Sequence, residues 1–440
     1  MIRPASTWFL AAALGLAAPV AAQAPLTLTE AIARARSQNP DVGVSAGAER
    51  EAAQRITQAR AGYLPKVDIA ESWQRGNQPV FVFGSLLAQR QFAASNFAID
   101  ALNHPDAVDN FRSAVMVEQS LFDKSTRSNV ALADIGRQIA TAGQVVVDDD
   151  LAARVTTAYG RVLVAVAAYQ SAGAGVEAAL ADRELAGYRR DAGRVTDADV
   201  LQIDVYAARA REQQIRATSD ERIARAELNL LMGEPLDATF ALDLPDTVAM
   251  IDTDNIAALE AEAMAHRPDV KTAALQEKLA SATVTAARAA FLPQVSAQGG
   301  WEFNGRAWNA RASSWVVGAG ARINVFHGFA DKGRLAEARE QVTRKALERK
   351  KAETSARLDV LTAVARVDAA HASEAVGRAV VEQARESRRI IRDRYEAGLA
   401  DVGSLLRAAE AVAQAETQQT AAQVSVLTET AALKRALGRR

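Results

Sequence analysis

The sequence predicts a mainly α-helical protein with a small membrane-spanning β part, built as two tandem repeats. Residues 59–68 recur with most positions unchanged as residues 287–296. In each copy an alanine-rich run stops at a proline, Pro65 or Pro293, and an alternating stretch follows. Proline cannot continue a helix, and it pushes the preceding residue towards extended geometry. Both copies therefore switch from helix to strand at the same point, which indicates a duplication.

Composition excludes several classes of function. Of the 440 residues, 49% are hydrophobic and only 5% are aromatic, which suits long, closely packed, alanine-rich helices. The 52 basic and 53 acidic residues nearly cancel, so the charge balance gives no sign of nucleic-acid binding. The chain has no cysteine, which excludes disulfides, thiolate metal sites, a cysteine nucleophile and a lipidated N-terminal cysteine.

Residues 1–24 are predicted to be a secretory signal peptide. Arg3 is followed by an apolar stretch at residues 8–16 and by the small-x-small site at residues 22–24. The stretch is short and is broken by Pro19, which argues against a membrane anchor. We expect no later stretch to approach the ~20 apolar residues of a spanning helix. The exported chain would then cross a membrane only as strands.

The signal peptide is followed by the first repeat, residues 25–233, a linker at residues 234–255, and the second repeat, residues 256–440. Thr27 or Thr29 can cap a short first helix through its side-chain oxygen. The helix breaks at Asn39-Pro40-Asp41, and the same break returns as Arg267-Pro268-Asp269. The linker is rich in proline and aspartate.

Four strands are expected, at about residues 66–75, 111–122, 294–303 and 314–326. The second pair alternates most clearly, with apolar residues at every other position. A strand of about ten residues with one apolar face fits a membrane barrel, although a soluble sandwich gives the same pattern. We expect Trp301 and Trp315, at the strand ends, to be membrane-interface aromatics.

A very long helix without proline should follow each strand pair, at residues 125–191 and 329–395. At ~1.5 Å per residue each would be roughly 100 Å long. The second carries two apolar stripes, one with Leu358, Leu361 and Ala365 and one with Val360, Val364 and Val367. A helix with two stripes packs on two sides, as in the wall of a tube.

Each long helix should end in a short turn, at residues 191–199 and 396–401. Gly193 and Gly398 occupy the places where a helix end favours a left-handed residue. Thr196 or Asp197, and Asp401, can cap the return helices, which run to Gly233 and Gly438. The number of residues that separates equivalent positions of the two copies is smaller at these glycines than at the prolines. The first copy is therefore longer, and its excess lies in residues 76–109.

Four strands cannot close a barrel by themselves. Lipid does not tolerate open strand edges, and closed outer-membrane barrels need at least about eight strands. The chain must then assemble with copies of itself.

The sequence resembles the TolC family of outer membrane efflux proteins over essentially its whole exported length. The resemblance rests on the duplication and on the order of five motifs, which are Asn39-Pro40-Asp41, Tyr63-Leu64-Pro65, Phe122-Asp123, Tyr395-Glu396-Ala397-Gly398-Leu399 and Leu405-Leu406. It implies a homotrimer in the outer membrane of a Gram-negative bacterium. Twelve strands would form the barrel, and twelve helices a periplasmic tunnel closed at its tip. Such ducts dock to a periplasmic adaptor and an inner-membrane pump or type I secretion transporter, and they use no cofactor.

The resemblance also assigns residues at the tip. Asp199 and Tyr395 match a gating hydrogen bond, Ala400 replaces the arginine that joins it, and the pore-narrowing aspartates fall on Ser404 and Arg407. With Asp401 these form the expected gate. The adaptor-docking turns would be Gly193-Arg194-Val195 and Gly398-Leu399-Ala400, although helix capping alone explains their glycines. A ring of Arg407 side chains predicts a mouth that attracts cations less than the family pattern does.

Other functions have less support. The four histidines, His104, His266, His327 and His371, lack metal-ligand spacing, and residues 148–150 form a charged run typical of a solvated helix face. No phosphate loop, nucleophile elbow or zinc signature is present, so the sequence does not indicate an enzyme. The alternative is a periplasmic long-hairpin coiled-coil scaffold or adaptor without a barrel. Strand alternation and two hairpins argue against it. The sequence does not identify the cargo.

Overall fold

In the computed structural model, the described residues are 25–243 and 251–439. The expected signal peptide and part of the linker lie outside them. The chain divides into two compact units, each with parts of both repeats. Of the described residues, the turn unit comprises 25–39, 151–243, 251 and 368–430. The sheet unit comprises 40–150, 252–367 and 431–439.

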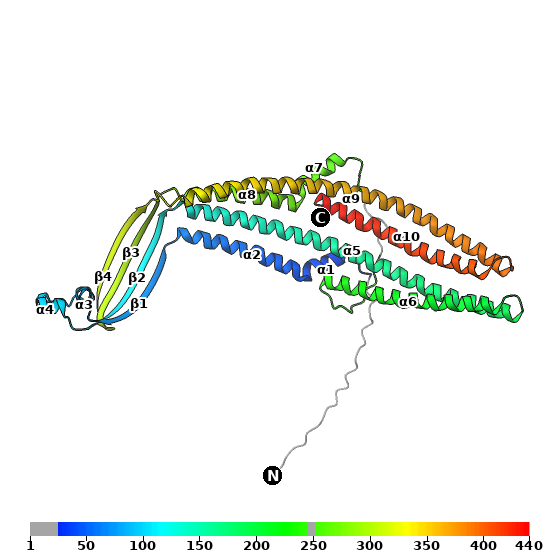
Figure 1. Ribbon diagram of the computed structural model, residues 1–440, viewed down its shortest axis with the longest axis horizontal. Coiled ribbons are helices and arrows are strands. Elements are labelled where there is room, and N and C mark those ends of the chain that lie inside the picture. Colours follow the sequence, from blue (N-terminus) through cyan, green and yellow to red (C-terminus); the bar gives the residue numbers. More distant parts are fainter. Residues whose placement is uncertain (1–24, 244–250, 440) are drawn as a thin grey trace, which may run out of the picture. The chain divides into compact units, whose positions relative to one another are not determined.

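Helices make up most of the described chain (Figure 1). They are α1 (Leu28–Gln38), α2 (Pro40–Arg60), α3 (Pro79–Ala88), α4 (Ile99–Asn103), α5 (Lys124–Asp191), α6 (Asp197–Met232), α7 (Ile256–His266), α8 (Pro268–Ala289), α9 (Ala330–Glu396) and α10 (Val402–Leu437). The two long helices, α5 and α9, have 68 and 67 residues. Thr27 caps α1 in a capping box with Glu30, as the sequence suggested.

The sheet has four antiparallel strands in the order β1-β2-β3-β4 (Figure 1). They are β1 (Lys66–Gly76), β2 (Val108–Phe122), β3 (Gln294–Ala307) and β4 (Ala310–Arg322). β4 ends before residue 326, where the sequence placed its end. The reason is that β3 begins at Gln294, which pairs with Arg322, so later residues have no ladder partner.

The two faces of this sheet differ in chemistry. Pairs such as Ile69 with Val115, and Val115 with Trp301, place alternate residues of all strands on one face. That apolar face includes Val67, Ile69, Trp73, Phe111, Val115, Val117, Val295, Ala297, Trp301, Phe303, Trp315, Val317, Ala319 and Ala321. The polar face includes Asp68, Ser72, Gln74, Asn110, Arg112, Glu118, Ser296, Gln298, Glu302, Asn304, Ser314 and Arg322.

In each repeat the end of a short helix, α1 or α7, meets the end of a return helix, α6 or α10, at a joint. A Cβ added at Gly233 would lie 2.9 Å from the Cβ of Gln38, and one at Gly438 would lie 2.8 Å from the carbonyl carbon of His266. Both glycines have positive φ, +73° and +72°. Only glycine combines that conformation with so close an approach. The equivalence supports a duplicated fold at the level of single residues.

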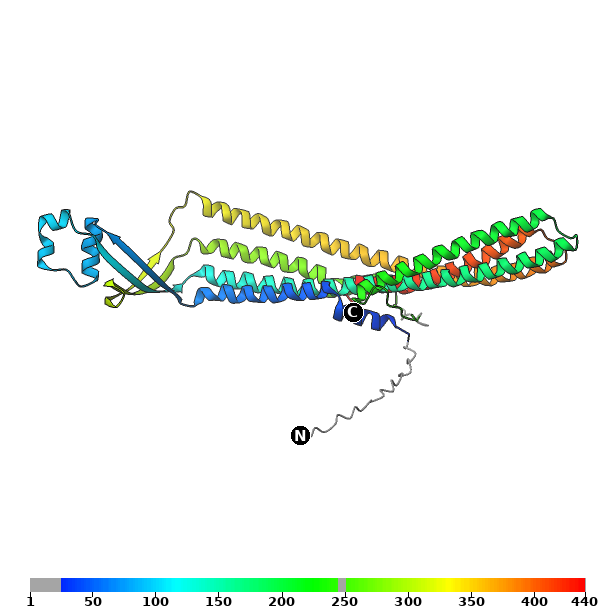
Figure 2. The same ribbon diagram turned by 90° about the horizontal axis from the view of Figure 1, so that it is seen from below.

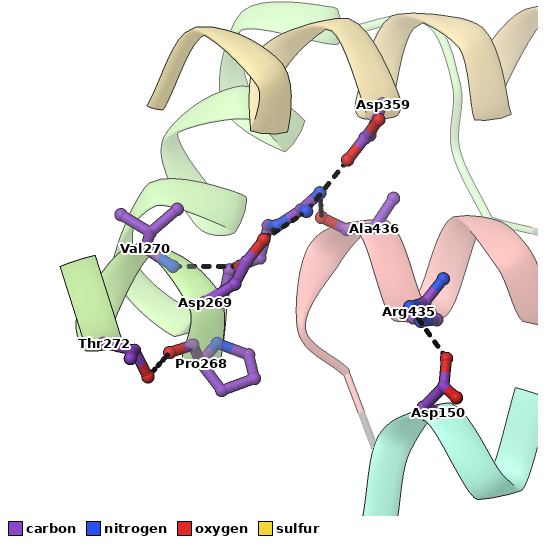
Figure 3. A network of polar contacts seen from close by, with 9 residues as sticks. Asp150, Pro268, Asp269, Val270, Thr272, Asp359, Arg435 and Ala436 are labelled. Carbon is purple, nitrogen blue, oxygen red and sulfur yellow. Dashed lines mark hydrogen bonds and ion pairs between the residues drawn. The ribbon is translucent and has the colours of Figure 1, made fainter. Parts of the chain in front are cut away.

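The second joint adds a network of charged groups (Figure 3). Arg267 donates to Asp269 at 2.7 Å, to Asp359 of α9 at 2.9 Å and to the carbonyl of Ala436 at 3.4 Å. In the first joint, Asn39 donates to the carbonyl of Leu231 at 2.9 Å. Residues of the same motif therefore tie the short helix to the return helix in both copies.

The two apolar stripes of α9 have different environments. Val360, Val364 and Val367 are buried. Leu358 and Leu361 are 60% and 48% exposed. One stripe is thus satisfied within the chain, and the other is left on its surface.

One helix in the described ranges, α5, has an 18-residue window with mean hydropathy 1.3 and no more than two charged residues. By length and composition α5 passes the test for a membrane-spanning helix, so the expectation that no later stretch approaches that composition is wrong for α5. The helix continues far beyond the ~20 residues that span a bilayer. It also carries ion pairs to α6, including Arg161 with Glu227 at 3.3 Å. We therefore assign α5 to the helical wall.

Candidate gate and membrane-facing surface

The two turns between long and return helices share one geometry. Gly193 and Gly398 have φ of +71° and +76°. In the first turn Arg194 N–H donates to the carbonyl of Arg189, and in the second Leu399 N–H donates to that of Arg394, both at 2.8 Å. These bonds satisfy carbonyls that a helix end leaves free. Capping accounts for the glycines, but not for Leu399, which is 79% exposed.

The return helices begin with capped first turns. Asp199 accepts hydrogen bonds from the N–H and the hydroxyl of Thr196, both at 2.8 Å, in a capping box at the start of α6. Asp401 accepts from Ser404 N–H at 2.6 Å. The backbone and hydroxyl of Ser404 hold the pKa of Asp401 below its ordinary value. Arg407, which is exposed, donates to the hydroxyl of Ser404 at 3.1 Å.

Tyr395 lies inside the turn unit rather than on its surface. It is 2% exposed and packs with Ala186, Ile203, Val402 and Leu405. Its hydroxyl is buried and has no hydrogen-bond partner among the described residues. The expected hydrogen bond from Tyr395 to Asp199 is therefore not formed within one chain. Asp199 caps its own helix, and the phenol ring is held by apolar neighbours.

Arg189 joins the two turns and was missed by sequence reasoning. It donates from Nη1 to the carbonyl of Tyr395 at 2.5 Å and from Nη2 to that of Glu396 at 2.7 Å. Its Cζ lies 4.7 Å from the centroid of the Tyr395 ring. A cation favours the carbonyl end of a helix, and an aromatic face attracts a guanidinium. The sequence shows a basic residue near the end of α5, but not that it caps α9.

A buried carboxyl also lies in the turn unit. Asp182 of α5 is 4% exposed. Burial raises its pKa, and the charges of Arg392 and Arg388 on α9 oppose that rise. Burial likewise raises the pKa of Tyr206 on α6. Nothing in the sequence distinguished Asp182 from the other aspartates of the helices.

The apolar face of the sheet carries aromatic residues near its end away from the long helices. Trp301 and Trp315 are direct cross-strand partners and are 53% and 74% exposed. The sequence placed both tryptophans at strand ends, but they lie inside the strands, because β3 continues to Ala307 and β4 begins at Ala310. Phe303 stacks against Trp301 with ring centroids 6.1 Å apart. On the same face Glu71, which is level with Phe303 in the register, pairs with Arg311 at 3.4 Å.

A second aromatic set, which the sequence analysis missed, lies where strands meet helices. It comprises Tyr63, Phe122, Phe291, Phe326 and Phe329, each at least 40% exposed. Lys332 lies over the ring of Phe329, 5.5 Å from its centroid. Between the two sets the apolar face has no charged residue. An apolar band between two aromatic sets is typical of membrane barrels.

The histidines and aspartates form no metal centre in the part of the chain that the structure describes. No group of three or more His, Cys, Asp or Glu side chains there could hold an ion. His104 lies 3.2 Å from Asp100, and His327 lies 3.6 Å from Asp331. Asp150 pairs with Arg435 at 3.0 Å (Figure 3).

The fold is similar to several solved outer membrane proteins. Campylobacter jejuni CmeC, described as an outer membrane channel, has a TM-score of 0.80 at 15% identity, covering 93% of this chain and 85% of CmeC. Vibrio cholerae VceC has a TM-score of 0.77 at 18% identity, covering 94% and 96%. The Neisseria gonorrhoeae MtrE outer membrane channel, in its open state, has 0.73 at 18%, covering 94% and 90%.

Sequence similarity agrees with the fold. Protein CyaE of Bordetella pertussis is 29% identical over 310 residues, which are 69% of this chain and 65% of CyaE. The match thus spans just under two thirds of that relative. The sequence model of the family described as outer membrane efflux protein matches residues 31–234 and 259–439. The chain belongs to the outer membrane efflux protein family.

Proposed function

We propose that this chain is one subunit of a homotrimeric channel-tunnel in the outer membrane of a Gram-negative bacterium. It would serve as the passive exit duct of a tripartite efflux pump or a type I secretion system. The observation that carries the proposal is the sheet, which has an exposed apolar face, a polar face and two unpaired edges. Lipid can cover the apolar face, but it cannot hydrogen-bond to the backbone N–H and C=O groups of the strand edges.

Closure by other copies removes both edges. Residues 66–75 of β1 are all exposed, so the strand presents unpaired N–H and C=O groups. If β4 of each copy pairs with β1 of the next, three copies give twelve strands, above the minimum of about eight. The exposed stripe at Leu358 and Leu361 supports the same conclusion for the helices, because it could pack against a neighbouring wall helix.

The gate would lie at the helix turns. Arg189 and Tyr395 would hold the two turns of one chain together, and Asp199 and Asp401 would fix the first turns of α6 and α10. Ser404 and Arg407 would line the mouth, where arginines repel cations. A strong cation preference that Arg407→Ala leaves unchanged would contradict this last point.

The same turns would bind the periplasmic adaptor. The surface would consist of Gly193-Arg194-Val195 and Gly398-Leu399-Ala400, with Leu399 as its exposed apolar contact. An inner-membrane pump or transporter would complete the assembly and select the cargo. The chain itself would carry out no chemistry.

The test combines mass in detergent with single-channel recording of the mature protein in planar bilayers. The proposal expects about three times the chain mass and a small conductance limited by closed turns. A monomer that stays soluble without detergent and forms no channel would contradict it. That result would instead favour the periplasmic coiled-coil scaffold.

A further inference from the structure

The excess residues of the first repeat fold into a compact segment. Residues 77–107, here called the cap segment, contain α3, the short 3-10 helix η2 (Ala94–Phe97) and α4. They join the end of β1 to the start of β2. The long helices attach to the opposite ends of these strands, so the cap segment lies at the far end of the sheet, as Figure 2 shows.

Apolar contacts attach the cap segment to one face of the sheet. Val82 and Leu86 of α3 are 5% and 8% exposed and pack with Val108, which is 4% exposed. Val108 alternates with Asn110 and Arg112, which belong to the polar face. A Cβ added at Gly76, also on this face, would lie 3.5 Å from the ring of Phe81. The cap segment therefore covers the polar face of the sheet.

Polar contacts fix the segment across three strands. Gln89 donates to the side chain of Asn110 on β2 at 3.0 Å, and Asn110 donates to Asn304 on β3 at 3.0 Å. Arg90 donates to the carbonyl of Ser313 on β4 at 2.9 Å. The three amide residues are buried. A loop that merely extended into solvent would not bury side chains against strands.

The segment leaves apolar side chains exposed. Val80, Phe97 and Ile99 are 87%, 65% and 79% exposed. The ring of Phe97 packs against that of Phe92 in an edge-on contact, with the two ring centroids 5.0 Å apart. In Figures 1 and 2, α3 and α4 lie beyond the strand ends that are away from the long helices, and α3 contacts β2, β3 and β4.

We propose that the cap segment closes over the channel at its outer mouth, because α3 covers the polar face of the sheet. The inference rests on the proposed function, because the polar face becomes the channel interior only when copies close the sheet. Each subunit then contributes a constriction at the exit.

The test measures access from outside the cell to the channel interior. The chain has no cysteine, so Gln298→Cys introduces a single thiol on the polar face of β3, deeper than Asn304. Intact cells are treated with a maleimide carrying a bulky polyethylene glycol. The matched cap variants are Val82→Asp, which buries a charge under α3, and Val80→Asp, which places it on the exposed side of the same helix.

We expect slow labelling with the unchanged cap and with Val80→Asp, and labelling about tenfold faster or more with Val82→Asp, because burying an unpaired carboxylate releases the segment. A small maleimide should label all three. Equal labelling by the bulky reagent in all three would overturn the cap while leaving the channel intact. Replacing residues 77–107 with a short Gly-Ser linker repeats the test if Val82→Asp does not assemble.

The mass of the Gln298→Cys protein in detergent is measured alongside. A monomer would reject the trimeric channel itself, whatever the labelling. A trimer with fast labelling of the unchanged cap would reject only the cap.

Discussion

The guanidinium of Arg189 at the end of α5 holds the carbonyl oxygen of Tyr395 at the end of α9, at 2.5 Å. It also holds the next carbonyl, that of Glu396, and lies over the Tyr395 ring. The two residues come from different repeats, so one side chain joins the two hairpins beside their turns. A contact between residues with no covalent link nearby can be broken and remade without unfolding either hairpin.

Replacing Arg189 should therefore loosen the turns. We expect Arg189→Ala to raise single-channel conductance and to shorten closed periods, since hydrogen bonds to a charged donor contribute about 1.5–3 kcal/mol each. Arg189→Lys should have an intermediate effect, because an ammonium lacks the planar fork that reaches two carbonyls. Planar-bilayer recording of the three proteins tests this.

The control for this prediction is the adjacent arginine. Arg190 bonds to Asp191 in its own helix and approaches Asp197, but makes no contact with α9 in the structure's hydrogen bonds and ion pairs. Arg190→Ala should leave conductance unchanged. Equal conductance for Arg189→Ala and the unchanged protein would contradict a role for Arg189 in the proposed gate.

Tyr395 should tolerate loss of its hydroxyl. The oxygen is buried without a partner among the described residues, and such a group costs about 1–3 kcal/mol. Tyr395→Phe should then leave the temperature at which the assembly dissociates in detergent unchanged or raise it. Tyr395→Ala should lower it, because it empties a cluster that includes Ile203 and Leu405. Lower stability and higher conductance in Tyr395→Phe would show that the hydroxyl finds a partner in the proposed trimer.

Much of the fold could be predicted because local chemistry determines it. Pro65 and Pro293 each prevent the preceding helix from continuing. Gly193 and Gly398 adopt the left-handed conformation that commonly ends an α-helix. The end of β4 could not be predicted in the same way. Ile323 and Val325 continue the alternation, but β3 begins too late to pair with them.

The candidate site was less predictable because it depends on which helices are neighbours. Spacing along α5 does not show that Arg189 reaches the end of α9, nor that Asp182 faces Arg388 and Arg392. The Asp199–Tyr395 contact was expected from the family resemblance. In this chain the carboxylate of Asp199 accepts a hydrogen bond from Thr196 instead. The face covered by α3 depends on strand register, which residues 76–109 do not reveal.

Two glycines of α5 should respond in opposite ways to alanine. A Cβ at Gly160 would lie 2.6 Å from Cγ1 of Val424 on α10, a stiff β-branched side chain, whereas one at Gly175 would meet nothing within 4 Å. Gly160→Ala should destabilise the protein by about 1–3 kcal/mol. Gly175→Ala should stabilise it by up to about 1 kcal/mol, because alanine favours a helix. Thermal dissociation in detergent measures both, and a loss of stability in Gly175→Ala would contradict this packing.

The network around Arg267 should make the stability of the folded protein depend on pH in the acidic range. Burial alone would raise the pKa of Asp269, but the hydrogen bond and charge of Arg267 outweigh it and hold that pKa below its ordinary value. A lowered pKa contributes stability above the ordinary value of about 3.9, and that stability is lost as pH falls through the folded-state value. Arg267→Gln should therefore cost about 1.5–3 kcal/mol near neutral pH and progressively less below about pH 4.

Thermal dissociation at a series of pH values measures this effect. Arg55→Gln is the control, because among the described residues Arg55 pairs only with Glu51 one turn away, and both side chains are about two thirds exposed. Such surface pairs contribute about 0–1 kcal/mol. A constant difference between Arg267→Gln and the unchanged protein from neutral to acid pH would refute the role assigned to Asp269.

The two faces of β4 give the sharpest test of the membrane assignment. Val316 and Val317 are adjacent and similarly exposed, 64% and 72%, but Val317 lies on the apolar face and Val316 on the polar face. If lipid covers the apolar face, Val317→Lys should cost about 2–4 kcal/mol at mid-membrane depth. It should reduce the amount of assembled protein in the outer membrane fraction and lower its dissociation temperature.

Val316→Lys is the matched control and should assemble normally, because a lysine there would face water in the channel. It should instead change conductance, since the added charge lies along the ion path. In a soluble coiled-coil scaffold both valines would face water, so both variants would behave alike. Equal tolerance of lysine at the two positions would therefore count against the barrel, and a loss confined to Val317 would identify the face that contacts lipid.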